Sequence, residues 1–282
     1  MTRTLAFTKA TACGNDFLLI DGTAVSEQQL KSVTREICDR HRGVGADGVE
    51  WLFSSEEAEV YAHLINSDGS HAEVSGNGTR CVAAWEMWRR LNEYRRPPEH
   101  IDEVLKAIGA EPQIRVLTDA GVKVCTLVSH SGAEFQFRID MGEPKIEGEI
   151  KIQLAGGECQ GVKLSTGNPQ FIVFVEEFPP DWPARGAEIE SHPDFPQRTN
   201  VEFVKVRGAN EIEIRIFERG AGETQSSGTG SCASAVAAVH MGRVKSPVRV
   251  VSPGGPQKVE WDGGKIFLTG PAQILCRGEF FL

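Results

Sequence analysis

The sequence SGTGSCA at 227–233 repeats the pattern of an earlier sequence, SGNGTRC at 75–81, and the two lie 152 positions apart. Two further pairs of segments are related by the same shift, and a third pair by a shift of 153. These pairs are GVEWL (48–52) with NVEFV (200–204), YAHLIN (61–66) with EIRIFE (213–218), and GNDF (14–17) with GNPQF (167–171). Four matches in one order predict two halves of about 150 residues each, built on the same plan.

Each half is predicted to be strands around one helix. The segments 61–66 and 211–217 alternate apolar and polar residues, which is typical of a half-buried strand. A glycine-rich turn and the S-G-x-G sequence follow, and then come small, helix-compatible residues at 79–91 and 231–242. Further strands, separated by the turn sequences DAG, GG and DGG, are expected within 114–128, 134–142, 151–164, 170–175, 248–253 and 258–270.

These elements predict an α/β (α+β) fold of two pseudo-symmetric lobes, each a β-rich, barrel-like sheet around a central helix. The N-terminal lobe is expected over 1–120, with a surface insertion at 93–113 that has no counterpart in the second half. The C-terminal lobe is expected over 121–274, and a last strand at 275–282 can return to the first lobe.

Composition narrows the classes of function. The formal net charge is −9, which argues against nucleic acid as a partner. No apolar run approaches the roughly 20 residues of a membrane span, and the first residues lack the apolar core of a signal peptide, so a cytoplasmic protein is expected. The seven cysteines are scattered without C-x-x-C spacing, so neither a disulfide framework nor a metal site is expected.

The twin S-G-x-G turns are the strongest candidates for a functional site. Glycines at the start of a helix allow close approach of a ligand, and unpaired N–H groups there favour a carboxylate. Ser75 and Ser227 precede these glycines, and two interpretations of them stay open: helix N-caps, or groups that transfer protons on opposite sides of a bound carboxyl group. The sequence GTGSCA also fits a dinucleotide fingerprint, but no acidic residue follows near 248–251, so no cofactor is expected.

At these positions the sequence resembles the diaminopimelate epimerase family. The resemblance rests on GNDF at Gly14, GVGADG at Gly43, NSDGSHAEVSGNGTRC at Asn66, GNPQ at Gly167, TNVEFV at Thr199 and ERGAGETQSSGTGSCA at Glu218. It implies an enzyme that converts LL- to meso-diaminopimelate without a cofactor, in lysine and cell-wall biosynthesis, using two cysteines as base and acid. It also suggests a homodimer with a small amino-acid substrate.

The resemblance assigns roles to individual residues. It implies that the backbone of Gly76, Asn77, Gly228 and Thr229 holds the reacting carboxylate. The distal amino-acid end would contact Asn15, Asn66, Asn168, Asn200, Glu218 and Arg219. An asparagine can both donate and accept, which suits a zwitterion, and arginine can pair with a carboxylate through two hydrogen bonds. Taken without the resemblance, these asparagines are typical of turns.

Three positions depart from the family pattern. The two catalytic cysteines of the family fall on Ser75 and Ser227, and its histidine after Asn-Pro falls on Gln170. An alcohol is a far weaker acid than a thiol and is not readily ionised at neutral pH. Two explanations account for the serines, an exchange of both cysteines in the laboratory or natural divergence, and Gln170 favours divergence. Cys81 and Cys232 lie too far along their helices to replace the family thiols.

Three hypotheses therefore stay open. The chain can be a diaminopimelate epimerase with reduced or absent activity. It can be a relative that catalyses another isomerisation or a dehydration of an amino-acid-like substrate, with Glu218, Glu223 or Asp68 as acid or base. It can also be a protein that binds an amino acid without catalysis.

Overall fold

The computed structural model describes residues 3–93 and 112–282, and most of the expected insertion at 93–113 therefore lies outside the described residues. The chain divides into two compact units, Met1–Ile139 with Gly270–Leu282, and Asp140–Thr269. The sequence placed these divisions at 120/121 and 274/275. The difference arises because the strands after residue 120 continue the sheet of the first unit instead of starting the second.

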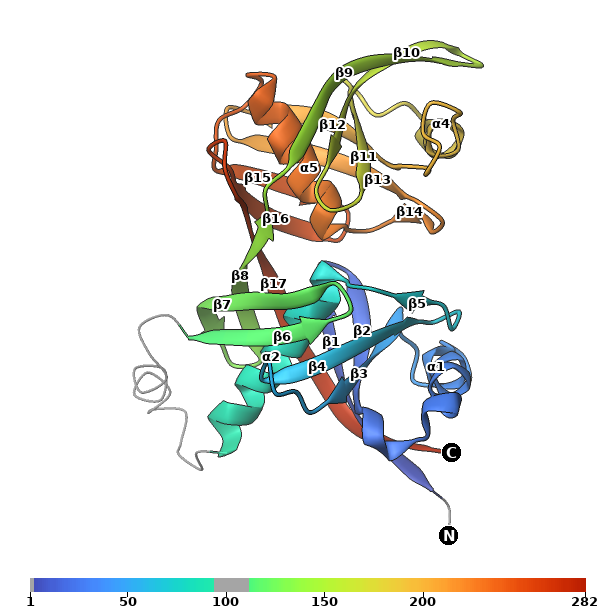
Figure 1. The fold of residues 1–282 in the computed structure, drawn as a ribbon, viewed down its shortest axis with the longest axis vertical. Helices are drawn as coiled ribbons and strands as arrows, with labels where there is room; N and C mark the ends of the chain where they lie inside the picture. The colour runs from blue at the N-terminus through green and yellow to red at the C-terminus, as the bar shows by residue number, and fades with distance from the viewer. Residues whose placement is uncertain (1–2, 94–111) are drawn as a thin grey trace. The chain divides into compact units, whose positions relative to one another are not determined.

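The described part of the first unit contains a closed ring of eight strands (Figure 1). Each strand pairs with the next, and β17 closes the ring by pairing with both β8 and β1. In order around the ring these are β1 (Thr4–Ala12), β2 (Asn15–Asp21), β3 (Gly48–Phe53), β4 (Val60–Asn66), β6 (Gln113–Thr118), β7 (Gly121–Ser131), β8 (Glu134–Gly142) and β17 (Ile266–Phe281). The short strand β5 (His71–Ala72) is added to β4, and α1 (Leu30–Cys38) contacts β3 and β4.

The second unit has an equivalent series of strands. Its strands pair in series and share β17 with the first unit. They are β9 (Lys145–Leu154), β10 (Gly157–Ser165), β11 (Pro169–Phe174), β12 (Asn200–Gly208), β13 (Glu211–Glu218), β15 (Val248–Ser252) and β16 (Gly255–Glu260). The strand β14 (Gly222–Thr224) is added to β13, and α4 (Trp182–Glu190) contacts β12, β13 and β14.

The two units agree in register as well as in order. In both, the second and third equivalent strands are parallel: β2 with β3, and β11 with β12. Val49 pairs with Ile65 on β3 and β4, and Val201 pairs with Phe217 on β12 and β13, which is the same pair shifted by 152 positions. The repeat seen in the sequence is therefore a structural duplication, and the predicted two-lobed α/β fold is confirmed.

Each unit encloses one helix. The helix α2 (Gly76–Glu93) contacts β1, β2, β4, β6 and β7, and α5 (Gly228–His240) contacts β10, β11, β12, β13, β15 and β16. Because α5 has strands on so many sides, nearly all of its residues are buried, and most of them are small. Branched side chains from the strands, such as Ile214 and Val250, pack onto it, and burying each stabilises the fold by about 1.5–3 kcal/mol.

The first hairpin sets the position of a candidate site residue. Cys13 and Gly14 connect β1 to β2 and both have positive φ, 49° and 83°. Positive φ at both central residues is the geometry of a type I′ turn, which matches the twist of the flanking strands. The turn places Asn15 at the first paired position of β2, opposite Ala12.

Closure of the first unit can be tested by truncation. Ending the chain at Leu275 removes the pairs from Thr4–Phe281 to Lys9–Cys276, and leaves β1 with an unpaired edge. We expect a loss of more than about 3 kcal/mol in the free energy of unfolding, because the lost pairs also bury core side chains. Urea denaturation followed by circular dichroism measures this. A chain that lacks Leu282 alone is the control, because that residue lies outside β17; equal midpoints for the two chains would contradict the expected role of β17.

Candidate functional site

Both S-G-x-G turns form the N-terminus of an enclosed helix. The Ser75 hydroxyl accepts a hydrogen bond from the N–H of Gly78 at 3.1 Å, and the Ser227 hydroxyl accepts one from the N–H of Gly230 at 3.2 Å. Both serines are therefore N-caps in the structure. The N–H groups of the first two residues of each helix have no acceptor within the helix, and can bind an anion. Capping and ligand binding are thus compatible at both turns.

At the first turn two of the predicted asparagines lie together. Asn77 is buried, and its Nδ2 donates to Asn15 Oδ1 at 2.5 Å. Asn15 Nδ2 in turn donates to Asp47 Oδ2 at 3.1 Å, and Arg80 donates to Asn77 Oδ1. These contacts fix the side chain of Asn77, while its backbone N–H remains at the helix terminus.

Asn66 has different surroundings. It ends β4, and its Nδ2 donates to Ser70 Oγ at 3.0 Å within the turn that follows. Asp68, one of the candidate acids, stabilises the same turn, because its carboxylate accepts from the N–H of Ser70 at 2.7 Å. Hydrogen bonds from Ser70 lower the pKa of this exposed carboxyl group. The local geometry at Asp68 is therefore that of a turn residue.

A buried carboxyl group lies beneath each turn, and neither was predicted from the sequence. A Cβ added to Gly78 would lie 2.0 Å from Glu50 Oε1, and one added to Gly230 would lie 2.5 Å from Glu202 Oε1. Burial, followed by the charge of Asp119, raises the pKa of Glu50 to about 8. Glu50 and Glu202 are 152 positions apart, and a lone acidic residue inside an otherwise apolar strand was the available signal.

At the second turn Ser227 has a carboxylate partner. The side chain of Ser227 interacts with the Glu218 carboxylate, and Thr224 Oγ1 donates to Glu218 Oε1 at 2.9 Å. Burial raises the pKa of Glu218 although both hydrogen bonds lower it. Burial, and then the negative charge of Glu218, raise the pKa of Glu202 well above the usual range. Two carboxyl groups with raised pKa values therefore lie near one serine, which is a pattern found at functional sites.

The remaining predicted residues of the second half lie in the same neighbourhood. Asn168 Nδ2 donates to Thr229 Oγ1 at 3.4 Å. Asn200 begins β12, where its Nδ2 donates to the carbonyl of Pro169 at 3.1 Å and its Oδ1 accepts from the N–H of Arg219 at 2.9 Å. The guanidinium of Arg219 is exposed and donates to the carbonyl of Gln197 at 3.1 Å. These contacts connect β11, β12 and the N-terminus of α5.

Gln170 is fully buried within this network. With its amide nitrogen turned toward Glu202 it donates to both carboxylate oxygens, at 2.9 and 3.1 Å, and its oxygen accepts from Asn200 Nδ2 at 3.2 Å. An amide cannot transfer protons, so this side chain positions Glu202 and Asn200.

The two turns therefore share a framework but differ in chemistry. Asn66 and Glu218 are equivalent in the duplication, 152 positions apart, so an amide near the first turn stands where the second has a carboxylate.

Glu223, another candidate acid, is exposed on β14. Cys81 is buried within α2, and burial raises the pKa of its thiol. Cys232 is buried within α5. Among the described residues that the sequence proposed as acids or bases, Glu218 is half-buried and lies beside a turn serine.

Comparison with known proteins identifies the family. The sequence pattern of the diaminopimelate epimerase family matches residues 7–147 and 162–275. A diaminopimelate epimerase from Pelotomaculum thermopropionicum is 38% identical over 291 residues, which cover 97% of this chain and 98% of that protein. One from Parabacteroides distasonis is 35% identical, covering 99% of this chain and 98% of that protein. The chain belongs to the diaminopimelate epimerase family.

Solved structures extend the likeness of fold beyond the diaminopimelate epimerases. A PhzF-family phenazine biosynthesis protein from Bacillus anthracis has a TM-score of 0.72 at 15% identity, with 99% of each chain covered. A hydroxyproline epimerase from Agrobacterium vitis has a TM-score of 0.70 at 16% identity, covering 99% of this chain and 91% of that one. A methylitaconate-delta-isomerase has a TM-score of 0.66 at 12% identity, covering 100% and 96%. Family and fold together support an epimerase or isomerase.

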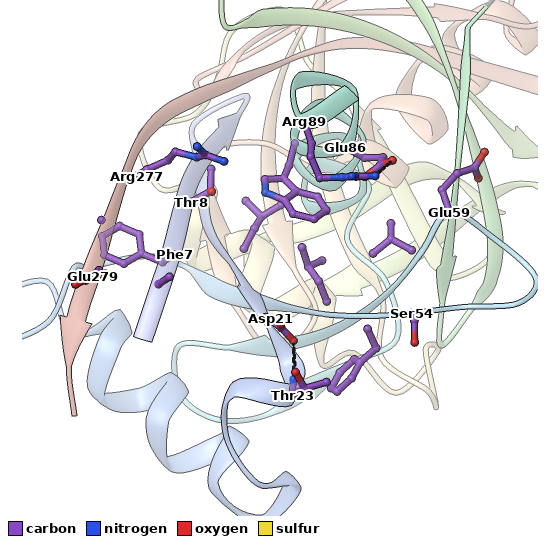
Figure 2. A pocket seen from close by; sticks show the side chains of 17 residues that line it. Phe7, Thr8, Asp21, Thr23, Ser54, Glu59, Glu86, Arg89, Arg277 and Glu279 are labelled. Atoms are coloured by element: carbon purple, nitrogen blue, oxygen red, sulfur yellow. Dashed lines mark hydrogen bonds and ion pairs between the residues drawn. The ribbon is translucent and has the colours of Figure 1, made fainter. Parts of the chain in front are cut away.

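A cavity of about 820 Å³ lies in the first unit (Figure 2), and the residues that line it do not include the Ser75 turn. Trp85, Glu86 and Arg89 from the second half of α2 line it, together with Phe7 and Arg277 from β1 and β17. Glu86 is 11 residues beyond Ser75 (86 − 75), or roughly 16 Å along the helix. The cavity therefore does not include the serine turn.

Within the described part of the chain, no helix has the length and apolar character needed to cross a membrane.

The close packing of Gly230 generates a prediction. In a Gly230→Ala variant the new Cβ would overlap Glu202 Oε1, whose side chain is buried and held by Gln170. We expect the free energy of unfolding to fall by about 1–3 kcal/mol, measured by urea denaturation. Gly208→Ala is the matched control, because a Cβ there meets no atom within 4 Å. Equal stability of the two variants would show that Glu202 does not constrain this turn.

The buried carboxyl group of Glu50 predicts a pH dependence of stability. Its pKa is about 8 in the folded state against 4.5 for an ordinary glutamate, so the folded state binds the proton more tightly. The resulting stability is fully present below about pH 4.5 and is lost as the pH rises through 8. From about pH 5 to pH 9, ionisation of Glu50 should lower the free energy of unfolding of the parent protein by on the order of 4 kcal/mol. In Glu50→Gln we expect this decline to be absent. Denaturation curves of the parent and of Glu50→Gln at the two pH values measure this decline. An equal decline in both proteins would show that Glu50 is not its cause.

Proposed function

We propose that this chain is a cofactor-independent isomerase that removes and returns the α-proton of a diaminopimelate-like amino acid, with Glu218 as the base. The interaction of the Ser227 side chain with the Glu218 carboxylate, beside the N-terminus of α5, carries the proposal. Serine by itself is a poor base at neutral pH, but a neighbouring carboxylate can take its proton. Membership of the diaminopimelate epimerase family supports the substrate class.

The proposed step moves one proton in a relay. As the Cα–H bond breaks, the Ser227 oxygen takes that proton and passes its own to the Glu218 carboxylate. The electron pair left on carbon spreads into the substrate carboxylate, which the N–H groups of Gly228 and Thr229 would stabilise. Return of a proton by the reverse relay restores Ser227, Glu218 and the original configuration, which gives exchange; inversion requires a proton delivered to the opposite face of the carbon, from the side of the first turn. A raised pKa suits this role, because a base works best when its pKa approaches the working pH.

Substrate binding completes the proposal. The N–H groups of Gly76 and Asn77 at the first helix, like those of Gly228 and Thr229, suit a carboxylate. The distal amino-acid end would contact the exposed guanidinium of Arg219 and the side chains of Asn15, Asn66, Asn168 and Asn200. Lysine biosynthesis, a cytoplasmic location and a homodimer follow from the family and belong to the same proposal.

A second candidate function has an observation of its own. The turn of Ser75 has Asn66 where the turn of Ser227 has Glu218, and an amide cannot accept a proton from serine. An epimerase needs a proton donor on the opposite face of the carbon, whereas a one-base isomerisation returns the proton on the same side. The asymmetry therefore favours slow epimerisation, or an isomerisation of another amino-acid-like substrate.

Exchange of the α-proton tests the base. We expect LL-diaminopimelate incubated with the protein in deuterated water to lose its α-proton signal in NMR. Glu218→Gln should slow the exchange by roughly 100-fold or more, because it removes a general base, while Glu223→Gln on β14 serves as the control. The rate should rise with pH through an apparent pKa above 4.5, since the base must be deprotonated and its pKa is raised. Exchange that is equal in both variants would refute the role of Glu218.

Restoring the thiols separates a weakened epimerase from a binding protein. The Ser75→Cys, Ser227→Cys double variant should form meso-diaminopimelate faster than the parent protein, because a thiol at a helix N-terminus ionises more readily. If the parent and the double variant both bind diaminopimelate in calorimetry but exchange no proton, the chain is a binding protein and the proposed reaction is wrong.

A further inference from the structure

Three side chains of the first unit converge at a place that the proposed reaction does not use. His63 Nδ1 lies 3.0 Å from Asp119 Oδ2, and His71 Nε2 lies 2.7 Å from the same oxygen. The three ligand atoms all lie within 4.8 Å of one another. From these contacts we propose that His63, His71 and Asp119 form a binding site for a divalent transition metal ion of the Zn²⁺ type.

The backbone brings these residues together. β4 and β6 are parallel with Val60 opposite Val116, and continuing that register sets His63 beside Asp119, just beyond the end of β6. β5 pairs with β4 so that His71 lies opposite Ile65. The cluster therefore rests on strand pairing, and needs no rearrangement of a loop to form. The three residues do not have a characteristic metal-binding spacing in the sequence, so no metal site was expected from it.

The chemistry of the three groups fits zinc. Two imidazole nitrogens and one carboxylate oxygen are a common set of zinc ligands, with bonds of about 2.0–2.2 Å to a metal that usually takes four ligands. Ligands around such an ion lie roughly 3–4 Å apart, so the present contacts need to open by less than about 1 Å. The two rings are stacked at 4.9 Å between centroids, and present their nitrogens to one point.

A supporting residue and an entry path are also present. Tyr61, two residues before His63 on the same face of β4, donates to Asp119 Oδ1 at 2.7 Å. This bond leaves Oδ2 directed at the histidines and is the kind of contact that orients a metal-binding carboxylate. The side chains of His63, His71 and Asp119 are 25%, 40% and 26% exposed, so an ion can reach them from solvent and water can complete the coordination.

The site would act on the segment that leads into the first turn. His71 lies four residues before Ser75, and His63 lies three residues before Asn66. A bound ion would connect β4, β5 and the β6–β7 turn through three side chains. We therefore expect it to stabilise the first unit and not to replace a catalytic group.

Zinc titration tests the site. Because Cys276 is exposed and could bind zinc by itself, the measurements use a Cys276→Ser parent. Isothermal calorimetry with zinc chloride should give one equivalent bound, and the melting temperature should rise with zinc concentration. Asp119→Asn and His71→Ala should abolish this equivalent, while Tyr61→Phe should weaken it by roughly 10-fold or more.

His41→Ala is the matched control, because His41 is exposed and lies outside the cluster. Circular dichroism establishes that each variant is folded, and the absorption spectrum of the Co²⁺ form reports the ligand set independently. Retention of the equivalent in His41→Ala with loss in the cluster variants would support the site. The proposal would be overturned if the parent bound less than one zinc ion per protein, or if folded Asp119→Asn and His71→Ala bound zinc as the parent does. The three residues would then form a hydrogen-bonded cluster only.

Discussion

Enclosure of a helix by strands is the constraint on which the rest of each unit depends. A helix with strands on many sides can carry few large side chains, which is why α5 is built from Ala, Ser, Val and Gly. At its N-terminus the helix leaves N–H groups without acceptors in the helix itself. Ser75 and Ser227 satisfy one N–H group at each helix. A helix N-terminus favours an anion such as a carboxylate, so the same constraint that stabilises the helix also favours the proposed binding position.

The buried carboxyl groups are the second consequence of this enclosure. Glu50 and Glu202 lie beneath glycines 78 and 230, where any larger residue would overlap them. An ionised carboxylate is costly in such surroundings, so burial raises both pKa values. Near the second turn Glu218 adds another negative charge, and the ionisation of Glu202 and that of Glu218 become linked. The duplicated framework thus supports two electrostatically different turns.

Duplication followed by divergence explains this difference. The strand order and register of the two units agree, down to the pairs Val49–Ile65 and Val201–Phe217. The units differ at side chains that the shared strand pairing does not fix, such as Asn66 in the first unit and Glu218 in the second. His63 and His71 are further examples, because Arg215 and Glu223 occupy the equivalent positions in the second unit. The proposed metal site is therefore a property of one unit alone.

The sequence by itself determined the duplication, the helices after each S-G-x-G and the membership of a family of epimerases, because these depend on local pattern and repetition. It also predicted Ser75, Ser227 and nearby asparagines as candidate site residues. It did not find that β7 and β8 belong to the first unit, because strand pairing between distant segments has no local signal. Nor did it find the contact of Ser227 with Glu218, the carboxyl groups buried under glycine, or the approach of His63 and His71 to Asp119. Those were decided by tertiary structure, since burial and strand register set pKa values and distances that no sequence spacing contains.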